Sequence, residues 1–146
     1  SYHRTHSGYA VAAFHEALRI YLQHGRAQKA ADYAHHEAAL RTAVQALGCE
    51  VTSNMTSLVV LNLPPSLAGR EKELVQNCRA KGFGIWPTLS EPVQVRIGIL
   101  NQLGEAAITE IVTRFAADMN AMGAGVDVNT ALSALESHYT AALAAE

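Results

Sequence analysis

Apolar residues recur every three or four positions over the first third of the chain, which predicts two helices in succession. The first helix is expected at residues 9–24 and the second at residues 27–47, each followed by a glycine that favours a helix end. The apolar stripe of the first helix consists of Val11, Phe14, Leu18, Tyr21 and Leu22. The predicted inner face of the second consists of Ala31, Ala34, Leu40, Val44 and Leu47.

The middle of the chain changes to short apolar, β-branched runs bounded by glycine and proline, which predict strands. The expected strands cover residues 49–52, 57–63, 83–86 and 93–100. The run at 57–63 is almost wholly apolar, so we expect it to be central in the sheet. Pro64 and Pro65 follow it, and neither can donate to a β-ladder. A helix over 67–80 is expected between the second and third strands.

Helical spacing returns after the last strand. Residues 105–122 carry a regular apolar stripe, and a final helix is expected at 129–144 with Asn129 as its N-cap. The stripe consists of Ile108, Ile111, Val112, Phe115 and Met119. The resulting order, α-α-β-β-α-β-β-α-α, predicts an α/β chain of the α+β sandwich type, in which helices cover a small, mostly antiparallel sheet.

One arginine interrupts the last predicted strand. Because side chains alternate along a strand, Gln94, Arg96 and Gly98 share one face, whereas Val95 and Ile97 share the other. A guanidinium can hold a carboxylate or a phosphate through two parallel hydrogen bonds. The alternative is a structural ion pair or an arginine that reaches solvent at a sheet edge. The strand pattern alone favours neither interpretation.

Composition and charge narrow the classes of function. The 146 residues suit one domain, 49% of them are hydrophobic, and the net charge is −2. This charge gives no reason to expect binding to nucleic acid or to an anionic membrane, and no apolar run is long enough to span a bilayer. Cys49 and Cys78 have no motif spacing, so they are expected to be thiols in the reducing cytoplasm.

Other chemistry-bearing residues favour structural interpretations. Seven histidines are present without a metal-binding motif, so no metal site is predicted. Solvated surface positions are expected for His24, His35 and His138, and a core position at a strand end for Trp86. No lysine occupies a setting typical of a Schiff-base nucleophile, and no Gly-x-Ser-x-Gly motif occurs.

The motifs in order resemble a known family. Tyr-His-Arg-Thr at residues 2–5 precedes the first helix, Lys-Gly-Phe-Gly-Ile-Trp-Pro occupies 81–87, and Val-Arg-Ile-Gly-Ile occupies 95–99. This order resembles the C-terminal small domain of class V, fold-type I aminotransferases that depend on pyridoxal 5'-phosphate (PLP). Members such as alanine–glyoxylate and 2-aminoethylphosphonate–pyruvate aminotransferases are similar. The resemblance implies an arm at residues 1–8 and the small domain at 9–123. Residues 124–146 lie beyond the resemblance and are expected to form a C-terminal helical extension.

The resemblance also implies roles for individual residues. Arg96 would hold the carboxylate of an amino acid or 2-oxo acid such as pyruvate or glyoxylate. Tyr2 and Thr5 would reach across a homodimer to the cofactor phosphate, since both hydroxyls can donate hydrogen bonds. The large PLP-binding domain, with the reactive lysine, would precede Ser1. The chain alone is therefore expected to have no transaminase activity.

Two alternatives remain open at the level of sequence. The chain could be a binding or assembly module that has kept the fold without the chemistry. It could also be a small regulatory domain that uses Arg96 to bind an amino acid. A continuous large domain encoded upstream of Ser1 would favour the aminotransferase, and a native start codon there would favour a stand-alone module.

Overall fold

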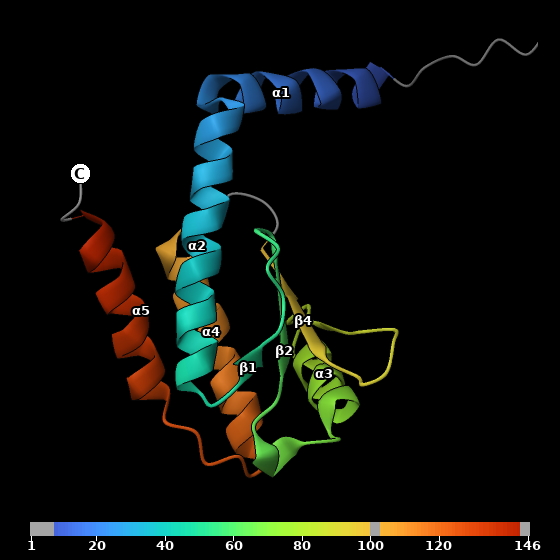
Figure 1. Ribbon diagram of the computed structural model, residues 1–146. Coiled ribbons are helices and arrows are strands. Elements are labelled where there is room, and N and C mark those ends of the chain that lie inside the picture. Colours follow the sequence, from blue (N-terminus) through green and yellow to red (C-terminus); the bar gives the residue numbers. More distant parts are fainter. Residues whose placement is uncertain (1–7, 100–102, 144–146) are drawn as a thin grey trace, which may run out of the picture. The chain divides into compact units, whose positions relative to one another are not determined.

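The computed structural model describes residues 8–99 and 103–143 and divides the chain into two compact units, Ser1–Asp32 and Tyr33–Glu146 (Figure 1). Tyr2 and Thr5 lie outside the described residues. The predicted domain borders at residues 8 and 123 stay predictions.

The predicted order of helices and strands is confirmed. The first unit contains α1 (Gly8–His24), and α2 (Arg26–Ala46) continues from it into the second unit. The second unit then follows in chain order: β1 (Glu50–Val51), β2 (Leu58–Asn62), the 3₁₀ helix η1 (Pro65–Leu67), α3 (Glu71–Ala80), β3 (Trp86–Pro87), β4 (Val95–Gly98), α4 (Glu105–Ala121) and α5 (Val128–Leu143).

The four strands form one sheet in the order β1-β2-β4-β3, and every neighbouring pair is antiparallel. β2 is central, as its apolar sequence predicts. Val59 lies opposite Ile97, and Leu61 lies opposite Val95, so the buried positions of the two central strands coincide. The register therefore places the alternate residues of β2 and β4 together on the other face.

One hydrophobic core lies against the buried face of the sheet. It combines the inner side chains of the central strands with those of the helices in the second unit. The largest fully buried members are Phe115, Leu40, Leu61, Leu67, Leu74, Ile85, Ile97, Ile99, Ile108 and Met119. This α+β arrangement, with a small antiparallel sheet and helices packed on it, confirms the predicted fold class (Figure 1).

The apolar faces of the first two helices are only partly buried. The α1 stripe from Val11 to Leu22 is between 39% and 69% exposed. On α2, Leu40, Val44 and Leu47 are buried as predicted, but Ala31 and Ala34 are exposed. The inner-face prediction is therefore wrong for the N-terminal half of α2. Helical spacing identifies a common face, but it does not show how far along the helix that face is covered.

The helix predicted at 67–80 is divided. Residues 65–67 form η1, and α3 begins only at Glu71. Gly69 has a φ of +80°, a left-handed conformation that interrupts helical geometry. A continuous helix through this segment was therefore a wrong prediction, and the glycine in the middle of the apolar pattern is its physical cause.

Two element ends also differ from the predictions. Pro87 was expected to end the third strand, but it pairs with Val95 within β3, which is an edge strand and tolerates a missing donor. Asn129 was expected to cap the last helix, but the cap is Asp127. Its Oδ1 accepts a hydrogen bond from the Asn129 N–H at 2.9 Å, and its Oδ2 accepts one from the Thr130 hydroxyl at 2.7 Å.

Candidate functional site

β4 presents Arg96 on the face of the sheet that points away from the core. Val95 and Ile97 on either side of it are buried, at 0% and 1% exposed, and Ile99 is also buried. Gln94, Arg96 and Gly98 are half-buried on the opposite face. The alternation predicted from the sequence is thus confirmed, and the buried branched side chains fix which way Arg96 points.

Two apolar side chains flank Arg96 across the sheet. Val60 of β2 lies directly opposite on one side, and Trp86 of β3 lies directly opposite on the other. Residues paired in this way share a face, with Cβ atoms about 5 Å apart. We call the surface around the guanidinium the Arg96 face; it consists of Leu58, Val60, Asn62, Trp86, Gln94, Arg96 and Gly98.

The guanidinium of Arg96 has no partner among the residues that the structure describes. Its Nε–H group is buried and donates no hydrogen bond to any described residue. In contrast, Arg19, Arg41, Arg70 and Arg114 each form an ion pair with a glutamate. A buried donor without a partner costs roughly 1–3 kcal/mol, so an unpaired arginine here calls for an acceptor from outside the described residues.

The polar neighbours on the Arg96 face are already engaged with each other. The Gln94 Nε2 donates to Thr52 Oγ1 at 3.0 Å and to Asn62 Oδ1 at 2.9 Å. Asn62 Nδ2 in turn donates to Glu50 Oε2 at 2.9 Å. These bonds join β1 and β2 to Gln94, the residue before β4, and none of them involves Arg96, so they hold the face in place without neutralising its charge.

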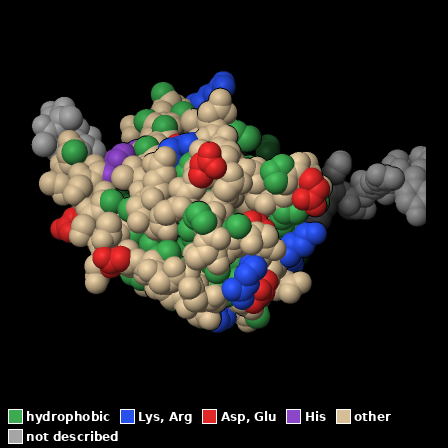
Figure 2. Space-filling view, turned by 60° about the horizontal axis from the view of Figure 1, so that its bottom comes forward, with side chains coloured by type: hydrophobic (Ala, Val, Ile, Leu, Met, Phe, Trp, Pro, Cys, Tyr) green, Lys and Arg blue, Asp and Glu red, His purple; other side chains and the backbone are tan. Residues whose placement is uncertain are grey.

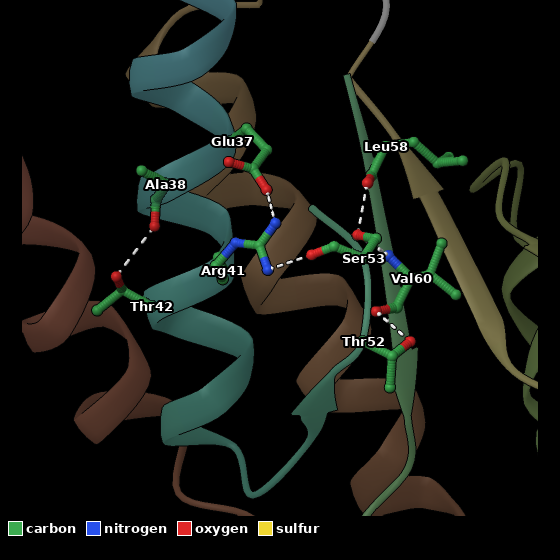
Figure 3. A network of polar contacts seen from close by, with 8 residues as sticks. All are labelled: Glu37, Ala38, Arg41, Thr42, Thr52, Ser53, Leu58 and Val60. Atoms are coloured by element: carbon green, nitrogen blue, oxygen red, sulfur yellow. Dashed lines mark hydrogen bonds and ion pairs between the residues drawn. The ribbon is translucent and has the colours of Figure 1, made fainter. Parts of the chain in front are cut away.

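A second polar network fixes the strand opposite Arg96 (Figure 3). Arg41 on α2 forms an ion pair with Glu37 and donates from Nη1 to the Ser53 carbonyl oxygen at 2.6 Å. The Ser53 hydroxyl donates to the Leu58 carbonyl at 2.8 Å and accepts from the Val60 N–H at 3.0 Å. Helical spacing alone does not predict this role of Arg41, because its partner Ser53 lies in a loop twelve positions away.

Trp86 does not occupy the predicted core position. Its side chain is 46% exposed. The six-membered ring lies over Gly84, where an added Cβ would approach its Cη2 atom to 3.2 Å. The core prediction is wrong because β3 lies at the edge of the sheet and Trp86 alternates with the buried Ile85.

The histidines predicted to be solvated form a cluster between α2 and α5. The ring centroids of His35 and His138 are 5.0 Å apart, and both rings contact Tyr139. His36 Nδ1 and the Tyr139 hydroxyl form a hydrogen bond of 2.9 Å. Burial raises the pKa of Tyr139 to about 12, with the nearby Glu105 charge adding to the rise. The solvated interpretation of His35 and His138 is therefore wrong, and the side chain of His24 lies outside the description.

The described cavities lie away from Arg96. One of about 350 Å³ is lined by residues of the α3 start and the β3–β4 loop, among them Lys72 and Glu91. Another, of about 430 Å³, lies on α5 around Ser137. Within residues 8–99 and 103–143, no group of three or more His, Cys, Asp or Glu side chains is arranged to hold a metal ion. Neither of these two cavities is lined by Arg96, which is half-buried on the face of the sheet opposite the core.

The surface carries no extended area of one charge in the view of Figure 2, where acidic and basic side chains lie among each other. Among the helices that the structure describes, none is both long enough and apolar enough to cross a bilayer. These features leave the Arg96 face as the distinctive candidate site of the described chain.

The fold defines an α+β class in which helices cover one face of a small antiparallel sheet. No family model and no curated protein matches the chain. Among solved structures, the crystal structure of ureidoglycine-glyoxylate aminotransferase from Bacillus subtilis is similar, with a TM-score of 0.80 and 21% identity. The alignment covers 94% of this chain but only 37% of that one. The likeness establishes the fold, which is the predicted fold of an aminotransferase small domain.

Proposed function

We propose that this chain is the C-terminal small domain of a PLP-dependent class V aminotransferase, which moves an amino group between an amino donor and a 2-oxo acid such as pyruvate or glyoxylate. The observation that carries the proposal is the unpaired guanidinium of Arg96 on the face of the sheet opposite the core of this fold. The similar solved structure is itself an aminotransferase that uses glyoxylate, which supports the same class of substrate.

Arg96 would act as the clamp for the substrate carboxylate. Its guanidinium can donate two parallel hydrogen bonds, and the apolar neighbours Val60 and Trp86 lower the local dielectric around them. Holding the carboxylate fixes the orientation of the α-carbon, and orientation of this kind can contribute several powers of ten to a rate.

The cofactor and the remaining catalytic groups would come from outside the described residues. PLP, when bound, supplies the electron sink for the reaction. The resemblance assigns the phosphate of PLP to the hydroxyls of Tyr2 and Thr5 across a homodimer. It places the lysine that bonds PLP in the large domain. The free thiols of Cys49 and Cys78 support a cytoplasmic location.

The first test replaces the clamp in the complete enzyme. Arg96→Gln is expected to lower kcat/KM for 2-oxo acids by about 10- to 100-fold, because a hydrogen-bonded charge pair with the carboxylate is lost. Arg96→Lys is expected to restore little, since an ammonium lacks the planar fork. Arg114→Gln is the matched control, because Arg114 forms an exposed ion pair with Glu110 on α4. Unchanged kinetics in Arg96→Gln would refute the assignment of Arg96 as the carboxylate clamp.

The second test concerns the phosphate arm. Tyr2→Phe and Thr5→Val each remove one hydroxyl, so the dissociation constant of PLP from the complete enzyme is expected to rise about 10- to 100-fold, the value of one hydrogen bond to a charged group. Tyr9→Phe provides the control, because Tyr9 is 91% exposed on α1. If Tyr2→Phe and Thr5→Val bind PLP as tightly as the control Tyr9→Phe, the assignment of Tyr2 and Thr5 to the phosphate site is refuted.

A further inference from the structure

We infer that Trp86 is the side wall of the Arg96 carboxylate site and that it selects monocarboxylates with an aromatic or apolar group next to the carboxylate. This inference rests on the proposed function and specifies the class of substrate. Its starting point is the register of the edge strand, which places Trp86 directly beside Arg96 on the same face.

The register pairs Trp86 with Arg96 at the edge of the sheet, and the indole remains accessible. Trp86 is 46% exposed although it is the sole tryptophan of the chain and its neighbour Ile85 is fully buried. The absence of a side chain at Gly84 leaves room for the ring, since a Cβ there would approach Cη2 to 3.2 Å. A large exposed aromatic next to an unpaired charge combines an apolar surface with a carboxylate anchor.

The other neighbours of Arg96 extend this apolar surface. Val60 lies opposite Arg96 on β2, and Leu58 lies opposite Gly98, which contributes no side chain. A carboxylate held at Arg96 would therefore have its substituent next to indole and aliphatic groups. Contacts between aromatic rings are worth a further factor of about three to ten in affinity beyond their buried area.

The same face disfavours a second negative charge on the ligand. Among the described residues of the Arg96 face, Arg96 is the sole cation, and Gln94 and Asn62 are already bonded to each other. Glu50 accepts a hydrogen bond from Asn62 at the edge of this network and adds negative charge. A dicarboxylate would place its second charge in this environment without a counter-ion, which costs binding free energy.

The test titrates the 146-residue chain with phenylacetate, acetate and malonate. Calorimetry gives the affinities, and the fluorescence of Trp86 reports contact directly, because no other tryptophan contributes. Phenylacetate is expected to bind about three to ten times more tightly than acetate and to change the Trp86 emission, whereas malonate is expected to bind more weakly than acetate.

Variants separate the wall from the clamp. Trp86→Ala is expected to abolish the preference, so that this variant binds phenylacetate and acetate with affinities within about twofold of each other, whereas Trp86→Phe is expected to keep most of the preference. Leu89→Ala is the matched control, since Leu89 is an apolar residue of the same loop region and is 97% exposed. Circular dichroism of each variant checks that the edge strand and the fold are retained.

Each failure has a separate meaning. A preference for phenylacetate that survives Trp86→Ala, or an equal loss for all three acids, overturns the role of Trp86 and leaves Arg96 as the clamp. If none of the three acids binds, this inference is also overturned. The proposed function is judged independently by the kinetics of Arg96→Gln in the complete enzyme.

Discussion

At the scale of single residues, burial decides which polar groups need a partner. Asp118 on α4 is 3% exposed and forms an ion pair with Lys81, the residue that follows α3. The same carboxylate lies near Cys78, whose thiol pKa is raised to about 12, first by burial and then by Asp118. Burial alone raises the pKa of Cys49 to about 12. Both thiols are therefore protonated and structural at neutral pH.

The Lys81–Asp118 pair gives a prediction for stability. Lys81→Ala leaves the Asp118 carboxylate buried without its cation, so the free energy of unfolding is expected to fall by about 1–3 kcal/mol. Lys72→Ala is the control, because Lys72 is an exposed lysine on α3 without an ion pair among the described residues. Urea denaturation measures both, and equal stabilities would show that Asp118 is satisfied without Lys81.

At the scale of elements, the last helix depends on its first turn and on its contact with α2. Asp127 accepts hydrogen bonds from the Asn129 N–H and from the Thr130 hydroxyl, while His36 and Tyr139 connect α2 to α5 further along. The Thr130 hydroxyl, followed by the Asn129 N–H, lowers the pKa of Asp127 below its ordinary value. The ionised carboxylate therefore stabilises the folded state.

This cap predicts a defined dependence on pH. The folded pKa of Asp127 is lowered, so its contribution is present above the unfolded pKa of about 3.9 and is lost as the pH falls through the folded value. Asp127→Asn keeps an acceptor but removes the charge, and Asp127→Ala removes both. At neutral pH, the Tm from thermal unfolding is expected to be highest for the wild type, lower for Asp127→Asn and lowest for Asp127→Ala. The gap between wild type and Asn should close in acid; a gap independent of pH would contradict the role of the charge.

At the scale of the whole molecule, the stability of the second unit comes from one core. All members of that core lie between Ala39 and Tyr139, and Tyr33 is the earliest residue packed against it. Most large apolar side chains of α1 are exposed, from 39% at Tyr21 to 91% at Tyr9, and Ile20 is half-buried. The residues that form the core therefore lie from Tyr33 onward, and α1 contributes none of them.

A truncation tests this separation. A chain that begins at Arg26, the first residue of α2, keeps every core residue. Its cooperative unfolding is expected to be retained, with a free energy of unfolding within about 1 kcal/mol of the full chain, because none of the described residues that it removes has a buried apolar side chain. Urea denaturation of both chains measures this. A larger loss would show that α1 supports the core.

Much of the fold follows from periodicity, since alternation and helical spacing report local geometry. The existence and order of the helices and strands, the central position of β2 and the inner face of α4 were all predicted in this way. The errors concern features that depend on distant residues. Gly69 interrupts a helix through its backbone conformation, and Ala31 and Ala34 are exposed because the apolar pattern does not show where coverage ends.

The candidate site divides in the same way. The sequence by itself determined that Arg96 lies on the face opposite Val95 and Ile97, because side chains must alternate along a strand. Only the tertiary structure decided that this guanidinium has no described partner and that Trp86 and Val60 lie on either side of it. Strand pairing brings residues 60, 86 and 96 together. Which residues become neighbours in this way is set by the register of the whole sheet, and no local sequence pattern reports that register.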